Sequence, residues 1–115
     1  MRRPPIDADA VEKASAEVLP IRGESVARRI LESMCDPTRV NIIRALRASP
    51  LAASDLARVL GRTRSATSQH LRVLREVGAV AAERKGNVIR YRIGSGVAAT
   101  VLLEVSAAFD RVRAG

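Results

Sequence analysis

Side chains that can hydrogen-bond to nucleic-acid bases recur on one side of a predicted helix, Thr63–Val77. At about 100° per residue, Ser65, Ser68, Gln69 and Arg72 lie opposite the apolar positions. Gln can pair bidentately with adenine and Arg with guanine. The pattern predicts a surface that contacts DNA bases in the major groove. The alternative is an ordinary polar face, but such a face would be richer in Glu and Lys.

Positive charge is concentrated around this helix. Residues 58–92 contain nine of the 20 Lys and Arg residues but only two of the 12 Asp and Glu residues, in a chain of net charge +8. A concentrated basic stretch indicates contact with phosphates, whereas a solvated face kept for solubility would not need it. We expect Arg64 to contact a phosphate at the start of the helix. We expect three further contacts from a predicted hairpin: Arg84, Lys85 and Arg90.

The chain has one histidine and one cysteine, which limits the chemistry available to it. His70 falls on the apolar side of its helix, which predicts a packed or partly buried scaffold residue that could touch a phosphate; no second metal ligand is adjacent. Cys35 is expected to be a small buried hydrophobe. The alternatives for Cys35 are a sensor role through a link between two copies, or a response to a soft metal or an organomercurial. No nucleophile is paired with a base, so an enzyme is not expected.

Composition predicts one small domain with an aliphatic core. The chain has 115 residues, of which 47% are apolar and 2% aromatic. A single cysteine favours an intracellular protein, and the N-terminus lacks the apolar region of a secretory signal. No apolar run approaches the roughly 20 residues that span a bilayer. We therefore expect a cytoplasmic protein with no membrane partner.

Helix and strand signals predict a mainly α fold with a β-hairpin. We expect a disordered arm over residues 1–6 and one domain over residues 7–115. Asp7 or Asp9 would cap a first helix that runs to about Leu19 and is ended by Pro20, and a second helix would begin near Glu24. Asp36 and Pro37 would start a third helix that ends near Ala48, before a turn at Ser49-Pro50. The last three helices are expected at about 53–60, 63–77 and 97–112.

Two of these helices and the hairpin together predict a winged helix-turn-helix. The helix over 53–60, expected to bury Leu56, Val59 and Leu60, is followed by a three-residue turn with Gly61. Strands over 80–84 and 88–93 form the wing, in which Tyr91 is a packing anchor. The flanking helices, 7–20 and 97–113, carry apolar stripes without a partner in so small a domain. Packing against a second copy would bury them.

Several segments resemble the ArsR/SmtB family of bacterial winged-helix repressors. The resemblance rests on Met34-Cys35-Asp36-Pro37-Thr38-Arg39, on Ser54-Asp55-Leu56-Ala57, on the run from Ser65 to Gly78 and on Lys85-Gly86-Asn87 through Tyr91. It covers roughly residues 24–95. It implies a homodimer built through the first and last helices, an inverted-repeat operator in double-stranded DNA, and release by an inducer that is often a metal ion.

The chain departs from the metal-sensing members of that family. They carry a Cys-Val-Cys pair where this chain has Ala52, Ala53 and Ser54, and other members bind zinc through a last helix that here has no His. Members that sense sulfide or oxidants use two cysteines. We therefore expect no cofactor, with a metal held by Cys35 or by acidic residues such as Glu104 and Asp110 as the alternative. The alternative function is an inducer-independent architectural DNA binder or a protein-interaction module.

Overall fold

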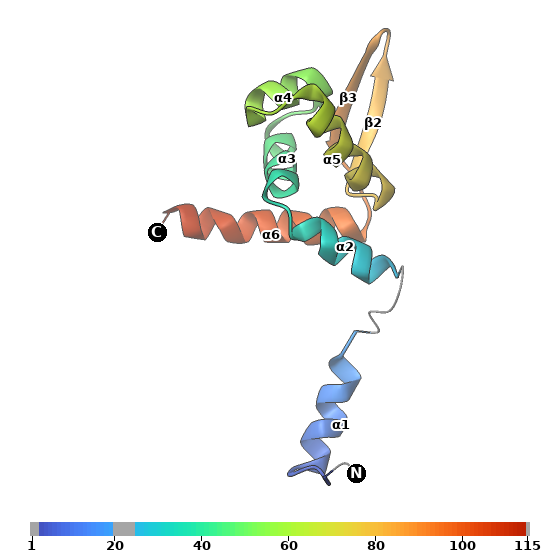
Figure 1. Cartoon of the computed structure of the whole chain (residues 1–115), viewed down its shortest axis with the longest axis vertical. Helices are drawn as coiled ribbons and strands as arrows, with labels where there is room; N and C mark the ends of the chain where they lie inside the picture. Colours follow the sequence, from blue (N-terminus) through green and yellow to red (C-terminus); the bar gives the residue numbers. More distant parts are fainter. Residues whose placement is uncertain (1–2, 20–24, 115) are drawn as a thin grey trace.

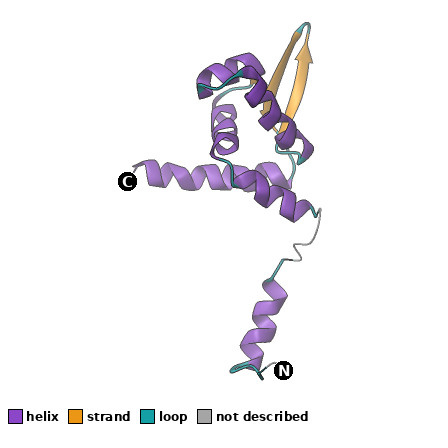
Figure 2. Cartoon of the chain, viewed as in Figure 1, coloured by secondary structure: helices purple, strands orange, loops and turns teal. Residues whose placement is uncertain are grey.

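The computed structural model describes residues 3–19 and 25–114, and it confirms a winged helix-turn-helix (Figures 1 and 2). Residues 3–6 are exposed and form neither helix nor strand, while the rest of the predicted arm lies outside the described residues. The elements are α1 (Ala8–Glu17), α2 (Val26–Met34), α3 (Pro37–Ala48), β1 (Leu51–Ala52), α4 (Ala53–Leu60), α5 (Arg64–Glu76), β2 (Val80–Lys85), β3 (Val88–Ile93) and α6 (Val97–Ala114).

The first two helices differ from the prediction at their ends. Asp7 caps α1 by accepting a hydrogen bond from the Ala10 N–H, but the helix ends at Glu17 and Val18 is extended. Helical geometry is disfavoured for a residue that precedes proline, so the helix does not reach Leu19. The predicted start of the second helix at Glu24 lies outside the described residues. Helix α2 begins at Val26 because the Ser25 hydroxyl accepts a hydrogen bond from the Arg28 N–H.

The core forms around α3, which begins as predicted with Asp36 as cap and Pro37 as first residue. Its buried Ile42 and Ile43 pack with buried leucines from three other helices, namely Leu56, Leu71, Leu74 and Leu102. The predicted burial of Val59 is wrong, since this side chain is 63% exposed. Ala57 is buried next to Leu56, which turns the inward face of α4 away from Val59.

The wing belongs to a sheet of three antiparallel strands in the order β1-β3-β2. Strand β1, which pairs Leu51 with Tyr91, was not predicted. It has two residues, too few to give an alternating pattern. Between β2 and β3 the pairing runs from Val80 with Ile93 to Lys85 with Val88, one residue beyond the predicted end of β2.

A close backbone approach fixes the wing to the end of α5. The Gly94 N–H donates to the Ala79 carbonyl over 2.8 Å, and a Cβ atom at Gly94 would overlap the carbonyl oxygen of Gly78. Only glycine fits at this position without a backbone shift. This contact closes the base of the wing, just after α5.

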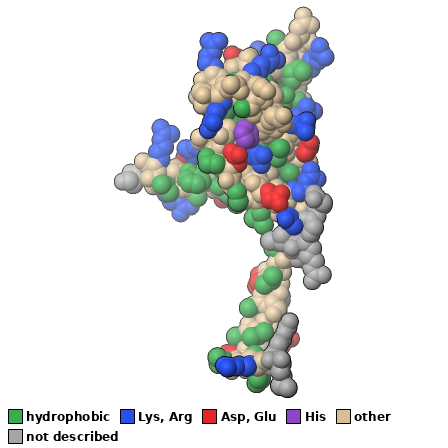
Figure 3. Space-filling model, viewed as in Figure 1, with side chains coloured by type: hydrophobic (Ala, Val, Ile, Leu, Met, Phe, Trp, Pro, Cys, Tyr) green, Lys and Arg blue, Asp and Glu red, His purple; other side chains and the backbone are tan. Residues whose placement is uncertain are grey.

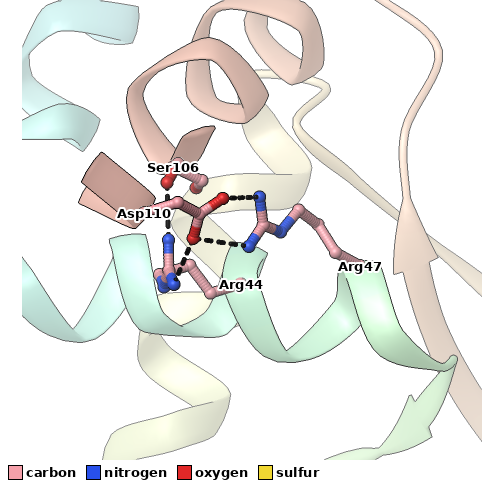
Figure 4. A network of polar contacts seen from close by, with 4 residues as sticks. All are labelled: Arg44, Arg47, Ser106 and Asp110. Atoms are coloured by element: carbon pink, nitrogen blue, oxygen red, sulfur yellow. Dashed lines mark hydrogen bonds and ion pairs between the residues drawn. The ribbon is translucent and has the colours of Figure 1, made fainter. Parts of the chain in front are cut away.

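Ion pairs connect α6 to α3 (Figure 4). The Asp110 carboxylate lies 2.7 Å from Arg44 Nη2 and 3.2 Å from Arg47 Nη1, and Arg44 also donates to the Ser106 carbonyl. Hydrogen bonds from Arg47 and Arg44 lower the pKa of Asp110 from 3.8 to about 2. These contacts, which we call the Asp110 clasp, hold the C-terminal half of α6 beside α3.

The flanking helices leave most of their apolar side chains uncovered. On α6, Ala98, Ala99, Leu102 and Ser106 are buried, while Val97, Phe109 and Val112 are exposed. Of the predicted α6 stripe, only Leu102 is fully buried. Helix α1 has no buried residue and extends away from the body in Figure 1.

Candidate nucleic-acid interface

Local hydrogen bonds set the start of α5. Thr63 caps the helix by accepting from the Ala66 N–H over 3.1 Å, and the Thr67 hydroxyl donates to the Thr63 carbonyl over 2.9 Å. Gly61, with φ at 65°, ends α4 in the left-handed region. The two helices are thus joined by residues 61–63, as predicted.

The predicted division of α5 into two sides is confirmed. The apolar side of α5 is buried or half-buried throughout: Ala66, Thr67, His70, Leu71, Val73, Leu74 and Val77. The four candidate residues opposite it are exposed, as is Glu76 on the same side: Ser65, Ser68, Gln69 and Arg72. Apolar periodicity alone was sufficient to orient this helix.

The four candidate base-contacting residues lie together. Ser65, Ser68, Gln69 and Arg72, which we call the reading face, line one shallow surface recess. Arg72 Nε is 3.7 Å from Glu76 Oε1, and both side chains are exposed. Such a surface ion pair contributes little free energy, so the guanidinium remains available to a ligand.

A second recess joins the start of α5 to the wing. Arg64 and Ser68 line it from α5, and Asn87, Ile89 and Tyr91 line it from the hairpin. Helix and wing therefore present one continuous surface. Asn87 and Ser54, which also lines this recess, were not predicted as site residues. Small polar side chains of this kind are common in turns and at helix starts, so no sequence pattern distinguishes these two residues.

The predicted wing contacts are exposed. Lys85 and Arg90 lie near the hairpin tip, where Figure 3 shows Lys and Arg side chains, and Arg84 Nε donates to the Gly86 carbonyl over 3.2 Å. Glu83 is the cross-strand partner of Arg90 and lies 3.9 Å from Arg92 Nε. The Glu83 carboxylate therefore offsets part of the positive charge of the wing.

His70 connects α5 to the start of α3. Its Nδ1 accepts a hydrogen bond from Arg39 Nε over 3.2 Å and lies 3.9 Å from Asp36 Oδ2. The other carboxylate oxygen of Asp36 accepts from the Thr38 and Arg39 N–H groups. The His70 ring is thus half-buried, as predicted, and it connects two helices.

Cys35 is exposed, so its predicted burial is wrong. It follows the last residue of α2, and its Sγ lies 3.4 Å from the Leu31 carbonyl oxygen. The physical reason is that Cys35 ends α2 and Asp36 caps α3, so Cys35 lies in the turn between the two helices (Figure 1) and not on a buried helix face. Among the described residues, no three His, Cys, Asp or Glu side chains gather as a metal site.

The fold and this surface define a winged helix-turn-helix DNA-binding protein. A family model described as "Bacterial regulatory protein, arsR family" matches residues 36–82. The chain is 35% identical over 85 residues to the HTH-type transcriptional regulator NmtR of Mycobacterium tuberculosis, covering 72% of this chain and 71% of NmtR. This chain belongs to the ArsR/SmtB family of transcriptional regulators. The proteins of this family are DNA-binding regulators, and the chain is not an enzyme.

Two further comparisons agree with this assignment. The chain is 31% identical over 91 residues to the HTH-type transcriptional repressor SmtB of Mycobacterium tuberculosis, covering 79% of this chain and 64% of that protein. The homodimeric winged helix-turn-helix DNA-binding domain of Mb0332 from Mycobacterium bovis has the same fold, with a TM-score of 0.66 and 23% identity over 78% of this chain and 91% of that domain. No helix in the described part of the chain has the length and apolarity to cross a bilayer.

Proposed function

We propose that this regulator is a dimeric, sequence-specific repressor that binds an inverted-repeat operator and is released by an inducer. The observation that carries the proposal is the chemistry of the reading face. It is exposed, it bears two hydroxyls, one amide and one guanidinium, and it lies on the second helix of a helix-turn-helix. These groups match base edges in the major groove.

Phosphate contacts flank the base contacts in this proposal. Arg64, in the first turn of α5, and the N–H groups of that turn that Thr63 does not bind would hold the DNA backbone beside the major groove. Arg84, Lys85 and Arg90 would place the wing over the backbone or in the minor groove, where arginine is favoured. His70 would hold α5 against α3 rather than read a base.

Uncovered apolar side chains support dimerisation. Val97, Phe109 and Val112 of α6 are exposed, as are Val11 and Val18 on or next to α1. A small domain gains apolar burial by pairing, and the Mb0332 domain is a homodimer. A two-fold dimer places two copies of α5 on successive turns of DNA, about 34–36 Å apart, which calls for an inverted repeat.

In this proposal no metal binds at the two positions that metal-sensing members use, the Cys-Val-Cys pair and the last helix, so the inducer would act elsewhere. Ala52, Ala53 and Ser54 offer no thiolate, and the last helix offers no imidazole. Elemental analysis of the purified protein tests this part directly. A screen for operator release with metals, thiol oxidants, organomercurials and small metabolites then tests whether Cys35 takes part, with Cys35→Ser as the matched variant.

Selection of bound duplexes from a random pool tests the proposal as a whole. We expect an inverted repeat, protected over both half-sites and occupied by two protomers. Recovery of no common sequence would instead favour the architectural binder.

A further inference from the structure

Glu76 is an acid at a position where local rules disfavour one. It is the last residue of α5 and lies on the same exposed side as the reading face. A carboxylate is unfavourable at the C-terminus of a helix, where the carbonyl groups already carry partial negative charge. A carboxylate beside DNA also repels phosphates. Residues that break several local rules at once mark functional or strained positions.

The two carboxylate oxygens of Glu76 contact arginines from two helices. Oε1 lies 3.7 Å from Arg72 Nε within α5, and Oε2 lies 3.8 Å from Arg29 Nη2 on α2. The order within α5, with the arginine four residues before the acid, is the less favourable one for helix stability. All three side chains are at least 41% exposed, so these ion pairs add little to the stability of the fold. Their effect is therefore expected in the orientation of a side chain.

Arg29 is anchored to the body of the domain, whereas Arg72 is not. The neighbouring Ile30 belongs to the core, and the buried Ser33 hydroxyl donates to the Arg29 carbonyl over 2.9 Å. Arg29 and Glu76 line one polar recess that α2, α3 and α5 form. The Arg72 side chain is 74% exposed, and Glu76 is its only ion-pair partner among the described residues. Glu76 thus connects an anchored arginine of α2 to the guanidinium of the reading face.

We propose that Glu76 is a specificity-determining residue, which positions the Arg72 guanidinium for a base edge. A contact at Nε leaves both Nη groups of Arg72 for a bidentate contact with guanine. An arginine that is oriented before binding loses less rotamer freedom in the complex. The same carboxylate repels the phosphates of every sequence, so Glu76 lowers affinity for DNA in general while favouring the sequence that Arg72 reads. The inference rests on the proposed sequence-specific binding and adds a residue that sharpens it.

Glu83 provides a matched control, because Glu76 and Glu83 are the two acids within residues 58–92. Glu83 lies on β2 of the wing and pairs with Arg92, away from the reading face. Glu76→Gln and Glu83→Gln in the full chain remove the same charge and keep the length of the side chain. Fluorescence anisotropy gives the affinity of each variant for a selected operator and for a random duplex at one salt concentration, and thermal unfolding gives its Tm.

We expect both variants to bind the random duplex more tightly than the unmodified chain does. Only Glu76→Gln should reduce the ratio of operator to random affinity, by about two- to tenfold, with no loss of Tm. In an Arg72→Ala chain, Glu76→Gln should leave the ratio unchanged, because no guanidinium remains to be positioned. Arg29→Gln should reduce the ratio as well, whereas Arg28→Gln, which removes an exposed arginine of the same helix, should not.

An unchanged ratio in Glu76→Gln, or an equal fall of the ratio in the Arg72→Ala chain, would overturn the proposal. A fall of the ratio together with a loss of Tm would also overturn it, because Glu76 would then belong to the fold. The unmodified chain separates two failures. If it binds both duplexes equally, the proposed sequence-specific binding fails, whereas if it and Glu76→Gln discriminate equally well, only the role of Glu76 fails.

Discussion

Two solvent-facing helix surfaces of this chain differ in chemistry. The reading face of α5 exposes hydroxyl, amide and guanidinium groups, whereas α6 exposes Val97 at its start and Phe109 and Val112 in its C-terminal half. Both helices also contribute to the same core, through Leu71 and Leu74 on α5 and Leu102 on α6. The shared core therefore does not determine the chemistry of the exposed side chains.

The difference indicates two kinds of partner. Small neutral hydrogen-bonding groups lose little when they exchange water for base edges, and they discriminate between bases. Apolar side chains gain free energy when any close-fitting apolar surface removes them from water. We infer that the surface of α5 selects DNA and that the surface of α6 selects another copy of the chain.

Substitutions in the reading face should have the greatest effect, on the free energy of specific DNA binding. The double variant Gln69→Ala, Arg72→Ala should lose about 2–6 kcal/mol of specific binding, at about 1–3 kcal/mol for each bidentate base contact. Fluorescence anisotropy with a selected operator measures the loss. Arg28→Ala, which removes an exposed arginine paired with Glu32 on α2, is the control and should bind normally. Unchanged operator affinity in the double variant would show that α5 does not read the bases.

Two positions on α6 should separate the contribution to folding from the contribution to dimerisation. Leu102→Ala empties a fully buried site and should lower the free energy of unfolding by about 2–5 kcal/mol. Val112→Ala removes an exposed side chain, so it should change the free energy of unfolding by less than about 0.5 kcal/mol while weakening the proposed dimer. Urea unfolding and sedimentation measure the two quantities. A large loss of stability in Val112→Ala at concentrations where the chain is monomeric would mean that this position belongs to the fold.

The wing should contribute affinity without selectivity. Lys85→Gln should weaken binding to operator and random duplexes alike, and should reduce the slope of log affinity against log salt by about 1. A salt titration with both duplexes gives the slopes. If the variant loses affinity for the operator alone, Lys85 contacts a base rather than a phosphate.

A weaker effect, on the pH dependence of Tm, is expected from the Asp110 clasp. The pKa of the Asp110 carboxyl is lowered from 3.8 to about 2 in the folded chain. The clasp therefore stabilises the fold fully above pH 3.8, which is the pKa of this carboxyl in the unfolded chain. This contribution disappears as the pH falls toward about 2. Asp110→Asn should remove the part of the pH dependence of Tm that lies in this window. The loss of Tm at neutral pH should be small, because the Asp110 side chain is half-exposed. Glu104→Gln, also on α6, is the control. The clasp has no role in stability if Asp110→Asn and the unmodified chain give the same acid profile.

Features that depend on residues close together in sequence were predictable. Apolar periodicity separates the two sides of α5. Local capping rules predict that α3 starts at Asp36-Pro37 and that α4 ends at Gly61. The remainder depends on contacts distant in sequence. Strand β1 exists because β3 passes beside it, and Cys35 is exposed because two helices meet at a corner. Arg39 and His70 are 31 residues apart, and no local pattern joins them.

If α5 reads the DNA sequence, the chain binds its operator far more tightly than other DNA, and the ratio of the two affinities measures this preference. The full chain is titrated against the selected inverted repeat and against a scrambled duplex of equal length and composition, at one physiological salt concentration. We expect binding to the operator to be at least about 10³-fold tighter than binding to the scrambled duplex. Equal affinity for the two duplexes would contradict it.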